Sequence, residues 1–182
     1  MAQVPTEIVE AAKDGDRVQM ERLLKAVWPD AFRLARAILG DPQSAQDVAQ
    51  EACIILCQTL VSLRRAAAFR VWFYRIVVRA ASQYRRRQSR IKPTIETASN
   101  ATDENVAIDV WRALSALPQR LREIVVLRYF EDLSSREIAS VLRTTDGAVR
   151  FHLMIAKRRL RPFLVEYEHT PETSNEVHLN AI

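Results

Sequence analysis

The stretch from Leu133 to Arg161 most constrains how this chain can fold, because its pattern predicts two helices joined by a tight turn. Ser134 and Glu137 have the spacing of a capping box, which satisfies free backbone donors where a helix begins. Thr145 is then the expected N-cap of a second helix, which begins at Asp146. The stretch therefore predicts a helix-turn-helix motif.

The second helix of this motif has one apolar side and one basic side. The apolar stripe comprises Val149, Leu153, Ala156 and Leu160. The basic residues off the stripe are Arg150, Lys157, Arg158, Arg159 and Arg161. A helix that packs on one side and is cationic on the other suits the DNA major groove. A solvated amphipathic hairpin would explain the stripe but not the one-sided charge, so the pattern favours DNA binding.

The composition of the 182 residues indicates an all-α protein with an anionic partner. Hydrophobic residues make up 48% of the chain, and only 3 glycines and few alternating β-branched runs favour helices over strands. The net charge of +5 is clustered, because the segment from Arg64 to Lys92 holds ten Lys or Arg and no acidic residue. A cluster of this kind suggests a polyanion such as nucleic acid.

Targeting, metal and redox signals are weak in this sequence. The N-terminus lacks the basic start and apolar run of a signal peptide, and no stretch is apolar enough to span a membrane, so we expect a cytoplasmic protein without membrane insertion. Cys53 and Cys57 lie four residues apart on a predicted helix, and we expect buried free thiols there. No histidine lies near them, and we expect no metal site.

The chain divides into two helical domains. We expect the first domain at 1–88, a polar linker at 89–105, the helix-turn-helix domain at 106–165 and an acidic polar tail at 166–182. In the first domain, the second helix is expected from Arg17 to Leu39. The third helix is expected to start at Ser44, which would be its N-cap. A loop from Leu63 to Phe69 then leads to a fourth helix that interleaves aromatic residues with arginines, a combination suited to unpaired bases and phosphates.

Two blocks of motifs in this order resemble a known family. The first block is Asp47-Val-Ala-Gln-Glu51, Phe69-x-x-Trp72-Phe-Tyr-Arg-Ile76 and Tyr84-Arg-Arg-Arg87; the second is Leu114-x-x-Leu-Pro118, Arg122-Glu123, Leu133-Ser134, Glu137-Ile-Ala139 and Gly147-x-Val-Arg150. Over roughly residues 6–165 the chain resembles the extracytoplasmic-function (ECF) sigma factors of the sigma-70 family. The resemblance implies a region 2-like helical bundle and a region 4-like helix-turn-helix, joined by a flexible linker.

The resemblance also implies a function and partners. An alternative sigma factor binds core RNA polymerase, at the clamp helices of its largest subunit and at the flap, and directs promoter recognition, DNA melting and initiation. It needs no cofactor and no catalytic residue of its own, since polymerisation belongs to the core enzyme. Members of the family are commonly held inactive by an anti-sigma factor, so such a partner is expected here.

The residues that match the family's motifs take three roles by resemblance. The core-polymerase-binding residues are Asp47, Gln50 and Glu51. The residues expected on the melted −10 strand are Arg64, Arg65, Phe69, Trp72, Tyr74, Arg75, Arg79, Gln83 and Arg86. Those expected on the −35 duplex are Thr145, Ala148, Arg150, Phe151, His152, Ile155 and Arg158.

The chain departs from the family at several of these positions. Arg79 and Gln83 replace Asn and Asp, and Arg143 replaces the glycine of the helix-turn-helix turn. Phe151, His152 and Ile155 replace Ser, Arg and Arg, so the family's promoter sequence does not transfer to this chain. Together with Met154, the side chains of Phe151 and Ile155 are expected to point outward, and we expect this apolar face to be covered by an inhibitor or by the first domain when the protein is off DNA.

Two other functions are compatible with parts of the sequence. A stand-alone helix-turn-helix regulator would account for Leu133 to Arg161 but not for the aromatic and basic stretch from Phe69 to Arg87. An α-helical metal-dependent hydrolase would use Asp41, Asp47 and Glu51, but no histidine lies near them and they sit at a helix start, where acidic residues are favourable without any ligand.

Overall fold

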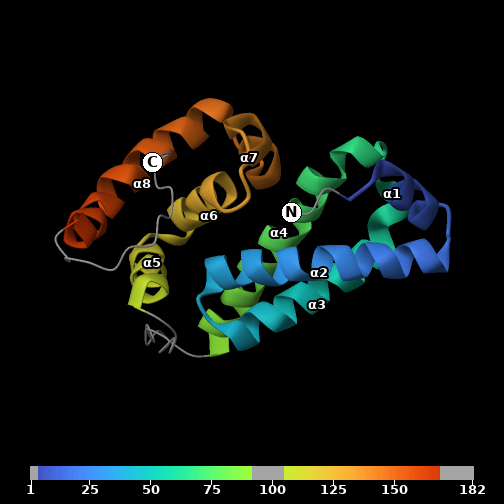
Figure 1. Cartoon of the computed structure of the whole chain (residues 1–182), viewed down its shortest axis with the longest axis horizontal. Coiled ribbons are helices and arrows are strands. Elements are labelled where there is room, and N and C mark those ends of the chain that lie inside the picture. Colours follow the sequence, from blue (N-terminus) through green and yellow to red (C-terminus); the bar gives the residue numbers. More distant parts are fainter. Residues whose placement is uncertain (1–3, 92–104, 169–182) are drawn as a thin grey trace.

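The computed structural model describes residues 4–91 and 105–168, and this part of the chain is helical with no strand (Figure 1). The α-helices are α1 (Thr6–Lys13), α2 (Arg17–Leu39), α3 (Pro42–Thr59), α4 (Phe69–Ile91), α5 (Asn105–Ser115), α6 (Gln119–Tyr129), α7 (Ser135–Leu142) and α8 (Asp146–Glu168). Two short 3-10 helices, η1 (Leu60–Ser62) and η2 (Ala66–Ala68), lie between α3 and α4. The predicted all-α fold is confirmed.

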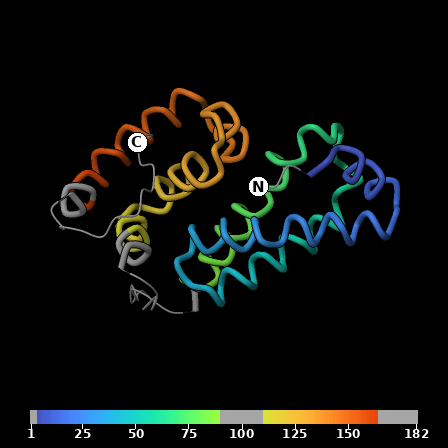
Figure 2. Tube along the Cα trace, in the orientation of Figure 1, coloured from blue at the N-terminus to red at the C-terminus, as the bar shows by residue number. Residues whose placement is uncertain are grey.

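The helices form two bundles, which are separate along the chain and packed against each other (Figures 1 and 2). In the first bundle, α2, α3 and α4 pack on one another and α1 packs on α2. In the second bundle, α8 packs on α5, α6 and α7. The largest fully buried apolar side chains are Leu23, Leu34, Ile38, Leu56, Leu60, Phe73 and Tyr74 in the first bundle and Ile124, Leu127, Leu133 and Ile138 in the second.

The helix ends of the first bundle follow local capping rules, with one correction to the sequence analysis. Helix α2 starts at an Asp16 side chain that accepts hydrogen bonds from two backbone amides, and it ends at Gly40, whose φ of 82° favours glycine. Helix α3 is capped by Asp41 and not by Ser44, because Asp41 Oδ2 accepts from the Ser44 amide at 2.7 Å. Pro42 then occupies the first turn, where its missing amide hydrogen costs little. The hydrogen bonds from Ser44 lower the pKa of Asp41.

The helix-turn-helix forms as its sequence predicts. The capping box is complete: the Glu137 amide donates to Ser134 Oγ at 3.3 Å, and the Ser134 amide donates to Glu137 Oε2 at 2.8 Å. The hydroxyl of Thr145 accepts from the Ala148 amide at 3.2 Å at the start of α8. Between the helices, Arg143 ends α7 in the left-handed region with φ 49° and ψ 55°. The left-handed turn therefore forms even though arginine stands where glycine would fit best.

Polar contacts as well as helix packing join the two bundles. Helices α4 and α7 lie in contact, as do α2 and α6. The buried guanidinium of Arg122 in α6 donates to the carbonyl of Ile38 in α2 at 3.0 Å. The guanidinium of Arg36 in α2 lies 5.4 Å from the ring centroid of Trp111 in α5, within the range of a cation–π contact.

The helices extend beyond the domain limits expected from sequence. Helix α4 runs to Ile91, past the expected end of the first domain at 88, and α8 runs to Glu168, past the expected end at 165. The rest of the predicted linker, 92–104, and most of the predicted tail, 169–182, lie outside the described residues. The division into two domains thus remains a prediction, although its two parts correspond to the two bundles.

Replacing Arg143 with glycine is expected to stabilise the protein. A left-handed conformation costs an L-residue about 1–2 kcal/mol, whereas glycine adds about 0.4–1 kcal/mol of entropy to the unfolded chain. The free energy of unfolding should therefore rise by up to about 1 kcal/mol, measured by urea denaturation. Arg159→Gly is the matched control, because Arg159 is exposed within α8. There glycine should lower the free energy of unfolding by about 0.5–1 kcal/mol, and equal losses in both variants would contradict the prediction.

Candidate nucleic-acid interface

Four residues expected on the melted strand line one cleft. Trp72, Arg75, Arg79 and Gln83 project from successive turns of α4 into a cleft of about 370 Å³. The other lining residues are Ile55, Thr59, Ile76, Ala80 and Arg143. We refer to it as the α4 cleft. Its volume is within the range of about 300–1,000 Å³ that is common for small-ligand sites.

The chemistry of the α4 cleft matches that of a nucleotide site. Three arginines, Arg75, Arg79 and Arg143, line it, and no carboxylate does. Trp72 is half-buried, so part of its indole remains available for contact. An aromatic surface beside several cations is the combination that holds unpaired bases and their phosphates. The cleft can therefore accept an aromatic, anionic ligand.

Two other predicted strand residues are buried in this structure. The ring of Phe69 stacks on Phe73 with centroids 5.8 Å apart and is 3% exposed, so Phe69 belongs to the core of the first bundle and does not face solvent. Tyr74 is 0% exposed. By contrast, Arg64, Arg65 and Arg86 are exposed, as strand binding requires. Aromatic residues and arginines alternate along α4, and the sequence alone could not distinguish the aromatic side chains that face the core from those that face solvent.

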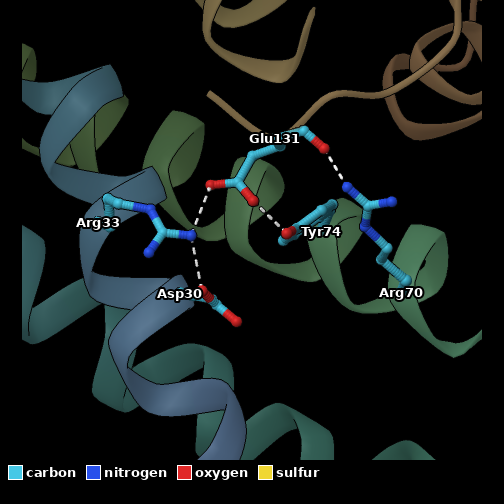
Figure 3. Close-up of polar contacts among 5 residues, drawn as sticks. All are labelled: Asp30, Arg33, Arg70, Tyr74 and Glu131. Carbon is cyan, nitrogen blue, oxygen red and sulfur yellow. Dashed lines mark hydrogen bonds and ion pairs between the residues drawn. The ribbon is translucent and has the colours of Figure 1, made fainter. Parts of the chain in front are cut away.

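Tyr74 belongs to a buried polar cluster that sequence reasoning missed (Figure 3). Its hydroxyl donates to the carboxylate of Glu131, which lies in the turn between α6 and α7. Arg33 Nη2 lies 3.5 Å from Glu131 Oε1 and 2.6 Å from Asp30 Oδ1, and the Arg70 guanidinium donates to the Glu131 carbonyl. Burial, and then the Glu131 carboxylate, raise the pKa of Tyr74, so the phenol keeps its proton.

The predicted polymerase-binding residues lie together on α3. Asp47 and Gln50 are exposed, and Glu51 is half-buried. Glu51 Oε1 lies 3.5 Å from Arg87 Nη2 of α4, a surface ion pair that contributes at most about 1 kcal/mol. The opposite side of α3 carries the buried residues Val48, Ala49 and Ala52. The cluster therefore presents an acidic, hydrated surface at the start of a helix.

Helix α8 has only part of its predicted stripe buried, since Leu153 and Leu160 are half-buried, and it has an uncovered apolar face. Val149 and Ala156 are fully buried, and Arg150 and Arg158 are exposed. Phe151 is 55% exposed and Met154 59%, whereas Ile155 is half-buried. The expectation that the first domain covers this face is therefore wrong for Phe151 and Met154, because the first bundle packs against α6 and α7 instead.

The other side chains predicted to face the DNA duplex are only partly accessible from solvent. Ala148 and His152 are half-buried, and the His152 ring meets the edge of Phe151 with centroids 5.9 Å apart. Thr145 is exposed, but its hydroxyl caps α8. The Arg150 guanidinium lies 3.2 Å from Asp146 Oδ2, one helical turn earlier. Of this set, Thr145, Arg150, Phe151 and Arg158 are exposed.

The two cysteines differ from the expectation of two buried thiols, since Cys53 is half-buried and Cys57 is exposed. Burial, and then the nearby Cys57, raise the pKa of Cys53 to about 11. In the described part of the chain, no group of three or more His, Cys, Asp or Glu side chains is placed to hold a metal ion. Among the same residues, no helix combines the length and apolar character needed to cross a membrane.

Comparison with known proteins assigns the two bundles. Residues 23–91 match the model of Sigma-70 region 2, and residues 107–160 match that of Sigma-70, region 4. The chain is 31% identical to the ECF RNA polymerase sigma factor SigD of Mycobacterium tuberculosis, over 87% of this chain and 82% of that protein. The chain belongs to the ECF sigma factors of the sigma-70 family. The sequence resemblance is thus confirmed.

Other sigma factors are similar over most of their length. This sigma factor is 31% identical to RNA polymerase sigma factor SigV of Bacillus subtilis, over 72% of this chain and 82% of that protein. Among solved structures, the sigma factor RpoE of Bartonella quintana, in complex with the anti-sigma factor NepR, aligns with a TM-score of 0.72 and 18% identity, covering 80% of this chain and 96% of that one. CnrH, in complex with the cytosolic domain of CnrY, aligns with a TM-score of 0.70 and 22% identity, covering 88% and 97%. These structures share its fold.

The family match and the structure do not favour the two alternative functions. A stand-alone helix-turn-helix regulator does not account for the region 2 match over residues 23–91. For the hydrolase, Asp41 already serves as the N-cap of α3. The relatives are sigma factors, which are transcription initiation factors and not enzymes.

Burial of Cys53 predicts selective alkylation of this sigma factor. With a pKa of about 11, roughly one thiol in a thousand is ionised at pH 8, and only the thiolate reacts. Iodoacetamide should therefore modify the exposed Cys57 first and reach Cys53 only after denaturation, as read by peptide mass spectrometry. Cys57→Ser, which leaves Cys53 as the only thiol, should make the native protein resistant. Equal modification of both cysteines in the folded wild type would contradict this assignment.

Proposed function

We propose that this sigma factor binds core RNA polymerase through α3, captures the melted −10 strand in the α4 cleft, and reads the −35 duplex with α8. The observation that carries the proposal is the α4 cleft, where Trp72, Arg75 and Arg79 converge without any opposing carboxylate. A duplex reader alone has no use for such a cleft, because bases in a duplex are stacked and offer no free face.

Strand capture in the α4 cleft needs contacts that offset unstacking. Extruding a base costs a few kcal/mol, and stacking on an aromatic side chain returns about 1–3 kcal/mol. Trp72 supplies the aromatic surface, and Gln83 supplies an amide that can both donate to and accept from a base edge. Arg79, with Arg64, Arg65 and Arg86 outside the cleft, neutralises phosphates.

Duplex recognition is assigned to the exposed side of α8. The Arg150 guanidinium can release Asp146 and donate two hydrogen bonds to guanine in the major groove, a contact worth about 1–3 kcal/mol of discrimination. Phe151, exposed one residue later, suits the methyl group of thymine. Arg158 lies two turns further along and suits a phosphate.

Polymerase binding is assigned to Asp47, Gln50 and Glu51, facing the clamp helices of the largest subunit. The exposure of Asp47 and Gln50 supports this assignment, since neither side chain serves the core of the first bundle. We further assign an anti-sigma partner to this protein, because RpoE and CnrH were both solved with protein partners. The exposed Phe151 and Met154 support such a partner.

Reversing charge at the α3 cluster is expected to weaken polymerase binding. The double change Asp47→Lys, Glu51→Lys should cost several kcal/mol at a complementary interface, whereas the stability of the sigma factor should change by less than about 1 kcal/mol. Titration of labelled core polymerase measures the affinity, and circular dichroism measures the helical content. Gln58→Lys is the control, since it adds charge at an exposed position of α3 outside the cluster. Undiminished affinity of the double variant would reject the assignment.

Removing a cation from the α4 cleft is expected to impair promoter opening. With Arg79→Ala, permanganate reactivity of promoter thymines should fall, because a phosphate contact is lost. The dependence of log affinity on log salt should become shallower by about 0.7 for that contact. Arg22→Ala is the control, since Arg22 is exposed on α2 and does not line the cleft. The promoter is first selected by run-off transcription from a promoter library, and normal melting by Arg79→Ala at every salt concentration would refute the strand assignment.

A further inference from the structure

Arg143 adopts a backbone conformation that costs stability, and its side chain lines the α4 cleft. It ends α7 in the left-handed region with φ 49° and ψ 55°, although its side chain is exposed and does not serve the core. This conformation is unfavourable for an L-residue and favourable for glycine. Strained residues that persist cluster at ligand sites, where the strain belongs to the function. The strain at Arg143 is therefore explained if its guanidinium has a ligand in the cleft.

Arg75 brings an unsatisfied donor to the same cleft. Its Nη2 donates to the neutral hydroxyl of Ser140 at 2.9 Å. Its Nε is shielded from solvent and has no hydrogen-bond partner among the described residues. A buried N–H without an acceptor is costly, and a bound anion is one of the few groups that can satisfy it. Arg75 therefore also indicates an anionic ligand.

The positive charge of the α4 cleft is not balanced within the described part of the chain. Arg75, Arg79 and Arg143 line the cleft without a carboxylate, and none of the three forms an ion pair with a described residue. By contrast, Arg33 pairs with Asp30 at 2.6 Å. Several arginines that share one cleft repel each other, so an anion with several charges stabilises them more than a single carboxylate would. The cleft thus matches a polyvalent anion.

An aromatic surface lies at one end of this arginine cluster. Trp72 and Arg79 lie on the same face of α4, about two turns or 10 Å apart along the helix axis, with Arg75 between them. A nucleotide has the matching form, because its base offers an aromatic face at one end and its phosphates carry charge at the other. The cleft volume of about 370 Å³ is near the lower end of the range for small-ligand sites, which suits one nucleotide better than a run of bases.

We propose that the α4 cleft binds one free nucleoside triphosphate, with its base against Trp72 and its phosphates held by the three arginines of the cleft. The proposal rests on the proposed function, because Trp72 and Arg79 are also the side chains assigned to the melted strand. It adds Arg143, to which the proposed function gives no contact with the strand. Free nucleotide and melted strand then compete for Trp72 and Arg79.

The lining of the cleft suits a nucleotide without its usual metal ion. Proteins generally hold Mg²⁺ through one or two carboxylates together with phosphate oxygens, and the residues that line the α4 cleft include no carboxylate. Guanidinium groups instead bind phosphate oxygens directly, often through two hydrogen bonds. Nucleotide binding is therefore expected to persist in EDTA and to weaken in excess Mg²⁺, which competes for the same oxygens. A requirement for Mg²⁺ would overturn the proposal.

Isothermal titration calorimetry of the full-length protein tests the class of ligand. ATP, GTP, CTP and UTP are titrated at fixed salt in EDTA, beside adenosine, which lacks the charge, and inorganic triphosphate, which lacks the base. At least one nucleoside triphosphate is expected to bind about tenfold more tightly than either fragment, because stacking and phosphate contacts both contribute. Inorganic triphosphate binding as tightly as every nucleotide would overturn the proposal, and so would four nucleotides that do not bind at millimolar concentration.

Changes in the second bundle locate the site. Arg143→Gly removes a guanidinium from the cleft and is expected to stabilise the fold, so a loss of nucleotide affinity would not come from unfolding. Arg136→Ala is the matched control, because it removes an exposed charge of α7 outside the cleft. We expect about a tenfold loss in Arg143→Gly, and less than about twofold in Arg136→Ala. Arg143→Asn, which tolerates a left-handed φ, should lose as much as Arg143→Gly. Equal losses in Arg143→Gly and Arg136→Ala would overturn the proposal, because they would reflect net charge alone.

Arg79→Ala separates this proposal from the strand assignment. It is expected to lose about tenfold in nucleotide affinity and also to impair promoter melting, whereas Arg136→Ala should leave both unchanged. If Arg79→Ala melts the promoter normally but binds nucleotide weakly, the nucleotide site stands and the strand assignment is wrong. If Arg79→Ala melts the promoter poorly and keeps its full nucleotide affinity, the strand assignment stands and the nucleotide site is wrong.

Discussion

One buried guanidinium, that of Arg122, holds the end of α5 in the second bundle and also contacts the first bundle. Three of its nitrogens donate to four carbonyls: Nε to Leu114 at 2.8 Å, Nη2 to Ser115 at 2.7 Å and to Leu117 at 3.2 Å, and Nη1 to Ile38 at 3.0 Å. Arginine cannot escape burial by losing its proton, although burial lowers its pKa, so its donors must find acceptors. The carbonyls at the end of a helix lack helical partners, and Arg122 satisfies those at the end of α5.

This guanidinium divides its contacts unequally between the bundles. Three of the four acceptors belong to the end of α5 and the turn that follows it, so most contacts of Arg122 lie within the second bundle. Only the bond to Ile38 reaches the first bundle, at the last turn of α2. Of the four hydrogen bonds of Arg122, separation of the bundles would therefore break only the one to the Ile38 carbonyl.

Sequence predicted the parts of this structure that are decided within a few residues. The capping box at Ser134, the cap at Thr145 and the length of α2 all follow from short patterns. The start of α3 was missed because Asp41 and Ser44 are both good caps, and the proline after Asp41 favours the earlier start. Arg122 meets Ile38 across 84 positions and Arg33 meets Glu131 across 98, and no local pattern records such pairs. For the same reason the sequence suggested strand contacts for Tyr74 but not its engagement by Glu131.

Arg143 gives the α4 cleft a dependence on ionic strength. It adds a third cation beside Arg75 and Arg79, and like charges that line one cleft repel each other. Arg79 and Arg143 are exposed, so dissolved ions screen their repulsion, whereas the contacts of the buried Glu131 are screened far less. Raising the salt concentration thus weakens the repulsion between Arg143 of the second bundle and the two arginines of α4, and it changes the contacts of Glu131 much less. The α4 cleft therefore attracts an anionic strand most strongly at low salt, where its own arginines also repel each other most.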